Sequence, residues 1–555
     1  MHFAATPAFV RGPNAVGRFE QEIRLLTVSC RRSEQRQHHG VRLRRVTKIN
    51  CGRGAIVTKL TPQWQARLSI YAPQLSARIP AQNLYLENLM LAKVFKAYDV
   101  RATYPKPLNE KLAWNIGYGA AQFLLTQAKA EGHDDPMMSN IVMGRDMRKS
   151  SPSLADALAQ GMRDYGANVI DIGMVDTPVV YFAINHFGCA GGIQVTASHN
   201  PANYNGFKIS RAHAKPVGQD TGLIDIQRFA ALVEKEKCEL RGGRIERRDV
   251  WAQYKAHLLR LLNDKTKSGA KKLRVAIDAS NGMAGTMVPN VFGDVAGLKI
   301  DPIHFDNSSG EFVHEPNPLV EANLAEVRAR VRETKADFGV CFDGDADRCM
   351  VIDELGEPIG CDLLLAVMLK EFLAQQTGAS VVYDLRSSRS VAEAIREAGG
   401  IAVESRVGHV FMKAKLAEVN APVGGELSGH FYFQDMFATD SGARAFISVI
   451  NALVDGGGKT LSQLVKPFRR YAQSGEINFE NENKLGAIAA LRAAYPNAKT
   501  HELDGLSLDA GEWWCNVRMS NTEPLLRLNL EAKDQATVDA VVAKLSPLLG
   551  HRVAH

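Results

Sequence analysis

The sequence has no long apolar runs and no paired cysteines. No stretch approaches the ~18 consecutive apolar residues that a membrane-spanning helix needs, so we expect a soluble chain without a membrane partner. Its eight cysteines are scattered, with no C-x-x-C pair or regular framework, at positions 30, 51, 189, 238, 341, 349, 361 and 515. This pattern disfavours a disulfide scaffold or a cysteine zinc site and predicts free thiols in a reducing compartment, the cytoplasm.

Extreme composition is absent as well. Hydrophobic residues make up 45% of the chain and charged residues 23%, the usual balance of a folded protein, which excludes a fibre or a disordered chain. The 555 residues exceed the roughly 250–300 that one hydrophobic core can serve. We therefore expect several domains.

Positive charge is concentrated at the N-terminus. Residues 1–60 hold twelve Lys and Arg against three Asp and Glu, a net charge of +9, while the whole chain carries +7, so the remainder carries −2. Because the basic character does not extend over the rest of the chain, we expect no nucleic-acid groove and no nucleic-acid partner.

Residues 1–89 form a basic extension with little sustained hydrophobic period. Three interpretations compete: an Arg-rich transit-like peptide, a nucleic-acid-binding tail, or sequence upstream of a true translation start at Met90. We favour the third, since "MLAKVFKAYDVR" opens a domain at once. The extension is thus expected to be disordered or not native.

Beyond Met90, short apolar runs alternate with amphipathic stretches, the pattern of β-α-β units. A Ser-Pro-Ser start signal precedes one of the helices. Three such units predict three related α/β domains with mixed or parallel sheets. The predicted elements are strands at 140–143, 168–172, 273–278, 380–385 and 401–404, and helices at 153–165 and 390–398.

A different signature closes the chain and is typical of a small α+β domain. It consists of helices at 484–494 and 535–548 and apolar strands at 505–508, 513–519 and 525–532. We place the four domains at 90–244, 245–354, 355–465 and 466–555.

The first polar loop of interest is "VTASHNPANYNGFKI", residues 195–209, whose Asn, Pro and Gly residues interrupt both helix and strand. Ser198 offers a hydroxyl that can carry a phosphoryl group, and His199, Asn200 and Lys208 can bind phosphate oxygens or move protons. By itself, an Asx-type turn with a capping serine explains the pattern as well. The other loops favour the chemical interpretation.

The second loop is "DGDADR", residues 343–348, between apolar strands at 338–342 and 349–352. Carboxylates at Asp343, Asp345 and Asp347 can converge on one hard divalent cation, with Gly allowing a tight bend and Arg348 supplying a fixed positive charge for phosphate. An EF-hand is excluded because the sixth position is not Gly and a strand-like run follows. The remaining alternative is an acidic surface turn.

The third and fourth loops are polar turns with different donor sets. "GGELSGH", residues 424–430, carries a carboxylate, a hydroxyl and an imidazole that suit sugar hydroxyls, although an ordinary polar turn is equally consistent. "RMSNTEP", residues 518–524, follows a strand, and its hydroxyls, backbone amides and Arg518 suit a phosphate; an ordinary turn with a surface arginine is the alternative.

With these four loops in this order, the chain from Met90 to its C-terminus resembles the α-D-phosphohexomutase superfamily, and within it the bacterial phosphomannomutase/phosphoglucomutase group. The resemblance rests on the joint occurrence of T-A-S-H-N-P, D-G-D-A-D-R, G-G-E-x-S-G-H and S-N-T-E-P, each weak alone. It implies three α/β domains and an α+β domain around a central cleft, each contributing one loop. Two departures are the basic extension and Ala102, where the family commonly has Gly.

The resemblance also implies roles for individual residues. It places Ser198 as the phosphoserine with Arg101, Lys208 and His409 in the catalytic set, to which the loops themselves add His199 and Arg348. Lys208 and His409 are the alternatives for the general acid or base. The Mg²⁺ ligands are Ser198, Asp343, Asp345 and Asp347. The substrate-binding set is Tyr98, Glu426, Ser428, His430, Arg518, Ser520, Asn521 and Thr522.

The implied activity is that of a phosphomannomutase, an isomerase of carbohydrate metabolism that works through a phosphoserine and a hexose 1,6-bisphosphate. Phosphoglucosamine mutases usually carry Gly-Thr-Glu-Pro in the fourth loop and Gln in the third, whereas this chain has Asn521-Thr-Glu-Pro and Leu427. Mannose phosphates are therefore preferred, with phosphoglucomutase or dual activity as the alternative. The expected partners are hexose phosphates, and the expected state is a monomer or weak homo-oligomer.

Overall fold

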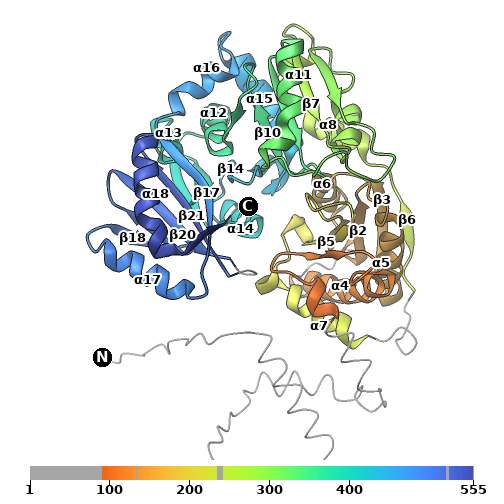
Figure 1. Ribbon diagram of the computed structural model, residues 1–555. Helices are drawn as coiled ribbons and strands as arrows, with labels where there is room; N and C mark the ends of the chain where they lie inside the picture. The colour runs from red at the N-terminus through yellow and green to blue at the C-terminus, as the bar shows by residue number, and fades with distance from the viewer. Residues whose placement is uncertain (1–89, 133–135, 234–241, 521–523, 554–555) are drawn as a thin grey trace, which may run out of the picture. The chain divides into compact units, whose positions relative to one another are not determined.

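The computed structural model describes residues 90–132, 136–233, 242–520 and 524–553 (Figure 1). They contain four β-sheets with covering helices, which confirms the predicted class of three α/β domains followed by an α+β domain. Among these described residues, no helix is both long and apolar enough to span a bilayer. The basic extension lies outside the described residues.

The first sheet has the strand order β1-β5-β4-β2-β3-β6. Alternate residues of its strands face two cores: Ile141 packs with helices α4, α5 and α7, whereas Val142 on the other face packs with α6. The strands are β1 (Val100–Thr103), β2 (Asn140–Arg145), β3 (Asn168–Met174), β4 (Gly191–Val195), β5 (Tyr204–Arg211) and β6 (Ile245–Arg247). The helices are α4 (Glu110–Ala130), α5 (Ser151–Tyr165), α6 (Thr177–Phe187) and α7 (Leu223–Leu232).

The second and third sheets have the orders β11-β10-β9-β7-β8 and β13-β12-β14-β15-β16. The strands of the second are β7 (Leu273–Asp278), β8 (Leu298–Ile303), β9 (Phe338–Phe342), β10 (Cys349–Ile352) and β11 (Pro358–Ile359). Those of the third are β12 (Ser380–Asp384), β13 (Ile401–Ser405), β14 (Val423–Gly425), β15 (Phe431–Phe433) and β16 (Thr439–Asp440). The accompanying helices are α8 (Trp251–Leu259), α9 (Asp264–Lys267), α10 (Ala284–Phe292), α11 (Ala325–Thr334), α12 (Cys361–Leu373), α13 (Arg389–Glu397), α14 (His409–Glu418), α15 (Gly442–Asp455) and α16 (Leu461–Val465).

These three sheets repeat one plan. In each, a central strand (β2, β7 or β12) has parallel neighbours on both sides, and one neighbour continues into an antiparallel strand. The connection between that parallel neighbour and its antiparallel partner is residues 196–203 in the first sheet, 343–348 in the second and 426–430 in the third. The first three loops singled out in the sequence thus occupy equivalent places in three repeats.

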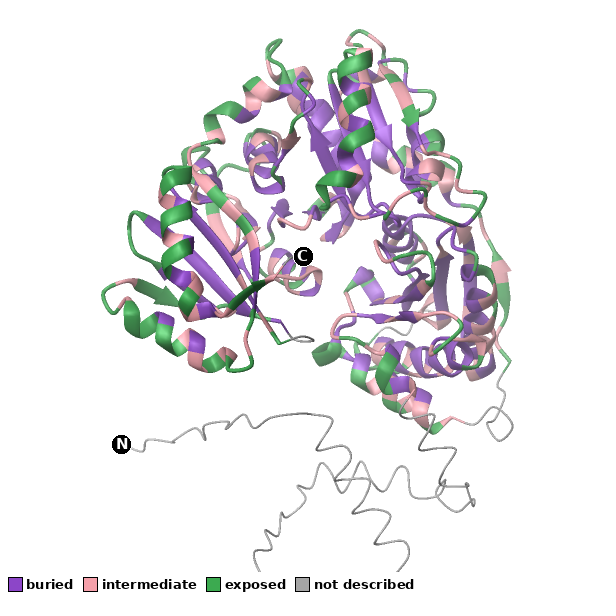
Figure 2. Ribbon diagram, in the orientation of Figure 1, coloured by how far each residue is buried: buried purple, intermediate pink, exposed green. Residues whose placement is uncertain are grey.

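The fourth sheet is antiparallel throughout, in the order β18-β19-β20-β21-β17-β22. Its strands are β17 (Ala472–Glu480), β18 (Lys499–His501), β19 (Leu506–Asp509), β20 (Trp513–Met519), β21 (Leu525–Ala532) and β22 (His551–Val553), with helices α17 (Lys484–Ala494) and α18 (Gln535–Leu549). Both helices bury one side against the sheet and leave the other exposed (Figure 2). Asp534 caps α18 by accepting from the backbone N–H of Thr537.

The predicted elements match closely, because their apolar patterns agree with the observed burial. Helix α5 begins at Ser151, two residues before the predicted start, since Pro152 belongs to its first turn. Ala102, which replaces the glycine common in the family, lies in β1 without positive φ. The predicted free thiols are confirmed for the five described cysteines, 189, 341, 349, 361 and 515; positions 30, 51 and 238 lie outside the described residues.

Candidate active site

Ser198 lies just beyond the end of β4, in a backbone conformation that few L-residues adopt. Its φ is +49°, and its N–H donates to Thr196 Oγ1 at 2.9 Å. The hydroxyl donates to Asp343 Oδ2 at 3.0 Å, and His199 Nδ1 lies 3.4 Å from the same oxygen. Strain of this kind persists only where surrounding contacts enforce it.

Arg148, which was not among the predicted site residues, supplies much of that enforcement. Its guanidinium is fully buried and pairs with Asp146 at 3.0 Å. The remaining donors bind loop carbonyl oxygens at 2.6–3.0 Å, those of Ser198, Asn200, Pro201 and Tyr204. One cation thereby fixes the shape of the serine loop from behind.

Asp343, Asp345 and Asp347 do converge, as the sequence predicts. All three are buried, and one carboxylate oxygen from each lies within 4.8 Å of the others. Burial, followed by repulsion from Asp347 and Asp345, raises the pKa of Asp343 well above its usual range. This concentration of carboxylates requires compensating positive charge.

Gly344 has a different role from the one expected. It does not adopt positive φ; the left-handed residue in the loop is Ala346, with φ +56°. A Cβ at position 344 would lie 2.4 Å from the carbonyl oxygen of Ser198. Glycine is therefore needed because the serine loop and the carboxylate loop pack backbone against backbone.

Lys208, from β5, is the cation closest to the carboxylates. Its Nζ lies 2.7 Å from Asp345 Oδ2 and 2.5 Å from Asp347 Oδ2. Burial alone would lower the pKa of Lys208, but Asp345 and Asp347 raise it. For Asp347, burial favours a raised pKa, yet Lys208 and His430 lower it well below its ordinary value. Lys208 is thus held as an ammonium group.

The carboxylate loop also fits a divalent cation. Asp345 Oδ1 and Asp347 Oδ1 are buried and accept no hydrogen bond, so both are available as ligands next to the Ser198 hydroxyl. Oxygen-only donors of this kind suit a hard ion such as Mg²⁺. A second group, Asp347, His430 and Asp440, shares one carboxylate with this cluster.

The third loop contacts the second directly. Arg348 and His430 form an isolated backbone bridge, and Arg348 Nε lies 3.4 Å from His430 Nε2. His430 Nε2 is 3.4 Å from Asp347 Oδ1, and its Nδ1 is 2.7 Å from the Ser428 hydroxyl. Glu426 accepts from the Tyr432 hydroxyl at 2.8 Å. The structure therefore brings the predicted sugar-binding residues beside the carboxylates.

His409 and Tyr98 lie at the edge of the same group. The rings of His409 and His430 are 6.4 Å apart, and Tyr98 packs edge-on against His409 at 5.8 Å. Burial, with a smaller effect from Lys413, lowers the pKa of His409 well below its ordinary value. Lys413, which was also not among the predicted site residues, is buried 3.1 Å from Asp440.

Arg101 and His199 flank the serine loop. Arg101 donates to Asn200 Oδ1 at 2.7 Å and forms an ion pair with Asp99. The positive charge of Arg348, and then burial, lower the pKa of His199 well below its ordinary value. His199 is therefore a neutral imidazole within reach of the Ser198 hydroxyl.

The fourth loop is connected to the third through a carboxylate–arginine chain. Arg518, on β20, donates to Glu476 at 2.6 Å, and Arg386 lies 3.7 Å from Glu476 and 3.5 Å from Glu426. Arg386, like Arg148, was not among the predicted site residues. The backbone N–H of Ser520 donates to a neighbouring strand, whereas Asn521 and Thr522 lie outside the described residues.

Comparison with known proteins agrees with this arrangement of domains. Sequence models of the phosphoglucomutase/phosphomannomutase α/β/α domains I, II and III match residues 92–231, 252–356 and 361–471, and the model of the C-terminal domain matches residues 476–547. The fold and the four matches define a multidomain phosphohexose mutase.

Relatives agree over most of the chain. A protein named phosphohexose mutases from Xanthomonas campestris is 38% identical over 466 residues, 83% of this chain and all of its own length. A phosphomannomutase from Escherichia coli is 36% identical over 464 residues, 82% of this chain and 98% of its own. A crystal structure of a phosphoglucomutase/phosphomannomutase family protein from Burkholderia thailandensis is 30% identical with a TM-score of 0.73, covering 82% of this chain and 96% of that one. The chain belongs to the phosphoglucomutase/phosphomannomutase family.

Proposed function

We propose that this chain interconverts mannose 6-phosphate and mannose 1-phosphate through a phosphoryl group carried on Ser198, with activity on glucose phosphates as the alternative. The relatives named phosphomannomutase support the substrate class. The observation that carries the proposal is the position of the Ser198 hydroxyl, 3.0 Å from Asp343 among the charges of Lys208 and Arg348. A cytoplasmic location and a monomer or weak homo-oligomer belong to the same proposal.

The proposed reaction consists of two phosphoryl transfers. In the first, a free sugar hydroxyl oxygen bonds to phosphorus as the bond between phosphorus and Ser198 Oγ breaks, which yields a hexose 1,6-bisphosphate. The sugar hydroxyl gives its proton to a base, and Ser198 Oγ regains one. After the bisphosphate turns around, its other phosphoryl group returns to Ser198, so nothing is consumed overall.

The side chains of this site have separable tasks in that reaction. Lys208 and Arg348 stabilise negative charge on the phosphoryl oxygens, since both are cations fixed by neighbouring carboxylates. His199 is placed to exchange a proton with Ser198 Oγ, and His409 with a sugar hydroxyl. Mg²⁺ held by Asp343, Asp345, Asp347 and the Ser198 oxygen would neutralise phosphoryl charge that the three carboxylates otherwise repel.

Two sets of side chains would bind the sugar phosphate in either of its two orientations. Glu426, Ser428 and His430 offer hydrogen bonds to sugar hydroxyls, while Arg518 and Ser520, with the predicted Asn521 and Thr522, would bind the phosphate that is not transferred. The chain of contacts from Arg518 through Glu476 to Arg386 supports placing these two sets together.

Replacing the serine tests the proposal. We expect Ser198→Ala to remove the phosphate seen by intact-protein mass spectrometry after incubation with hexose 1,6-bisphosphate, and to lower kcat by on the order of 10³-fold or more. The matched control is Ser153→Ala, which replaces a partly buried serine on α5 and should keep both the phosphate and the kcat of the wild type. A fully active Ser198→Ala enzyme would refute the phosphoserine.

A coupled assay separates the remaining candidates. With catalytic hexose bisphosphate present, mannose 1-phosphate and glucose 1-phosphate are compared as substrates, and a higher kcat/KM for mannose 1-phosphate is expected. A metal-dependent phosphatase, the rival activity for the same aspartates, would release inorganic phosphate and show no activation by the bisphosphate.

A further inference from the structure

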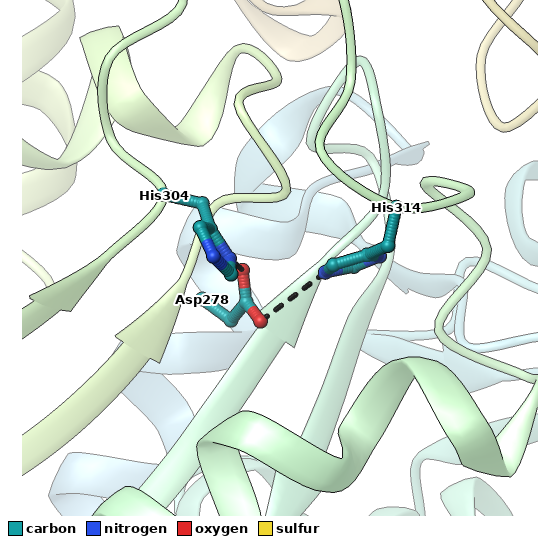
Figure 3. A group of neighbouring side chains, drawn as sticks. All are labelled: Asp278, His304 and His314. Carbon is teal, nitrogen blue, oxygen red and sulfur yellow. Dashed lines mark hydrogen bonds and ion pairs between the residues drawn. The ribbon is translucent and has the colours of Figure 1, made fainter.

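A second group of metal-binding side chains lies in the second repeat, outside the proposed active site. Asp278 ends β7, His304 follows β8, and His314 lies in the segment that leads from β8 toward α11 (Figure 3). His304 Nδ1 is 3.2 Å from Asp278 Oδ1, and His314 Nε2 is 3.3 Å from Asp278 Oδ2. Both imidazoles are thus turned toward one fully buried carboxylate.

The three repeats show why this carboxylate is unusual. A buried aspartate ends or directly follows each central strand, and it accepts from the N–H two residues later at 2.7–3.1 Å; these are Asp146, Asp278 and Asp384. In the first and third repeats that later residue is Arg148 or Arg386, whose guanidinium neutralises the aspartate. In the second it is Ser280. The two histidines face Asp278 in place of the arginine.

The outer ring nitrogens of both histidines have acceptors. His314 Nδ1 donates to the carbonyl oxygen of Glu315 at 2.9 Å, and His304 Nε2 pairs with Glu326 at 3.3 Å. Histidines that bind metals typically donate their other N–H to a carbonyl or carboxylate in this way. With the outer nitrogens occupied, each inner nitrogen either carries a second proton that it donates to Asp278 or offers a lone pair to a metal ion, and in both cases a positive species neutralises the buried carboxylate.

The spacing suits a transition metal. Ligand atoms about 2.0–2.1 Å from a tetrahedral ion lie about 3.3 Å apart. The two histidines lie 3.2 and 3.3 Å from the two oxygens of Asp278, and one ligand atom from each of the three residues lies within 4.8 Å of the others. Two imidazoles and one carboxylate favour Zn²⁺ over Mg²⁺. The side chains of His304 and His314 are 19% and 20% exposed, so an ion can enter and keep a fourth position open to water.

We propose that Asp278, His304 and His314 form a second cation site, which takes a divalent transition metal of the Zn²⁺ type and is separate from the Asp343, Asp345 and Asp347 site. The proposal does not depend on the sugar-phosphate activity. It goes beyond that activity, because none of the three ligands belongs to the four loops of the proposed active site.

The site restrains a segment that touches the carboxylate loop and the arginine that supports the serine loop. His304 and His314 bracket Phe312, whose ring packs against Gly344 and lies 4.8 Å from the guanidinium of Arg148. His304 itself has φ +51°, a strained conformation. A metal bound between the two histidines would hold Phe312 behind the serine loop and the carboxylate loop.

Metal titration of the tag-free full chain tests the proposal. In excess Mg²⁺, which occupies the oxygen-only site, we expect the protein to retain about one equivalent of Zn²⁺. Co²⁺ used as a probe should give the strong visible absorption of a low-coordinate site. His304→Ala and His314→Ala should each lose that band and weaken Zn²⁺ binding by ~10-fold or more.

Two further variants locate the binding. His551→Ala removes an exposed histidine on β22 and should leave the Co²⁺ band unchanged, as should Asp345→Asn in the oxygen-only site. A band that survives in the His304 and His314 variants, or disappears in Asp345→Asn, overturns the proposal. If the histidine variants do not fold, imidazole NMR of the wild type decides: Zn²⁺ must shift the His304 and His314 resonances, and unchanged resonances overturn the site.

Discussion

The three repeats share one turn at the end of the central strand, but the buried aspartate of that turn is neutralised in two different ways. Asp146 and Asp384 pair with Arg148 and Arg386, whereas Asp278 faces two histidines. A buried carboxylate without a cation is strongly unfavourable, so each repeat needs some solution. An arginine gives a permanent charge, while a pair of histidines leaves a position that a proton or a metal ion can occupy.

The arginines also act beyond their own aspartates. Arg148 binds the carbonyl groups of the serine loop, and Arg386 reaches Glu426 in the third loop and Glu476 in the fourth domain. In the second repeat the backbone replaces the arginine, since the Met283 N–H donates to the carbonyl oxygen of Gly344 at 2.9 Å. The same turn therefore supports the loop of its own repeat in each of these cases.

The largest expected effect comes from removing the arginine of the first repeat. Arg148→Met leaves Asp146 buried without a cation and four loop carbonyls without donors, so we expect a loss of about 3–5 kcal/mol in the free energy of unfolding and nearly complete loss of turnover. Urea unfolding, monitored by circular dichroism, measures the loss of stability, and the coupled mutase assay measures the loss of turnover. Arg163→Met, which removes a partly exposed ion pair with Asp164, should cost no more than ~0.5 kcal/mol.

A double variant separates the effect of Arg148 on stability from its effect on the shape of the serine loop. Asp146→Asn combined with Arg148→Met removes both buried charges and should regain part of the stability, but not the turnover, since the serine loop still lacks its donors. Recovery of turnover in the double variant would mean that Arg148 serves only to neutralise Asp146.

Removing the arginine of the third repeat should be the next largest change. Arg386→Met is expected to cost about 2–4 kcal/mol, less than the first because the side chain is slightly exposed and binds fewer partners. It should also raise KM for the hexose phosphate, since Glu426 and Glu476 lose their common cation. Arg389→Met removes a more exposed ion pair to Asp509 and is the control; an equal effect of both would contradict the special position of Arg386.

The contribution of Arg386 to stability should decrease as pH falls. Burial alone would raise the pKa of Asp384, but Arg386 lowers it below its ordinary value. A depressed folded-state pKa stabilises the protein above the unfolded pKa of about 3.9, and this contribution disappears as pH falls through the folded pKa. The stability difference between wild type and Arg386→Met should therefore narrow by about 1–2 kcal/mol below pH 4. Thermal unfolding from pH 7 to pH 3 measures it, and a constant difference would count against the pair.

These comparisons also show what the sequence predicts and what it does not. The four loops are short continuous motifs, so the convergence of Asp343, Asp345 and Asp347 follows from their alternation between two strands. Strand limits such as 273–278 were predictable because their apolar runs are bounded by turn residues. The domain boundaries and residue roles stay predictions.

Long-range support was not predictable in the same way. Arg148 acts on residues about 50 positions away, and His304 and His314 meet Asp278 across 26 and 36 positions. The need for Gly344 comes from a carbonyl in another domain. One signal was present in the sequence: D-x-R lies at or just beyond the end of two central strands, as Asp146-Met-Arg148 and Asp384-Leu-Arg386, whereas the second repeat has Asp278-Ala-Ser280.

The smallest expected effect lies in the second repeat. In protein freed of metal by a chelator, Asp278→Asn should cost only about 1 kcal/mol, because the amide oxygen can still accept from the Ser280 N–H and the two histidines are exposed enough to bind water instead. Asp384→Asn, which strands a buried arginine, should cost several times more under the same conditions. Chemical unfolding of the two variants beside wild type measures the difference. An equally large loss of stability in Asp278→Asn and Asp384→Asn would mean that the histidines carry a fixed charge, as the arginines do. The repeats would then differ only in the type of residue that pairs with the aspartate.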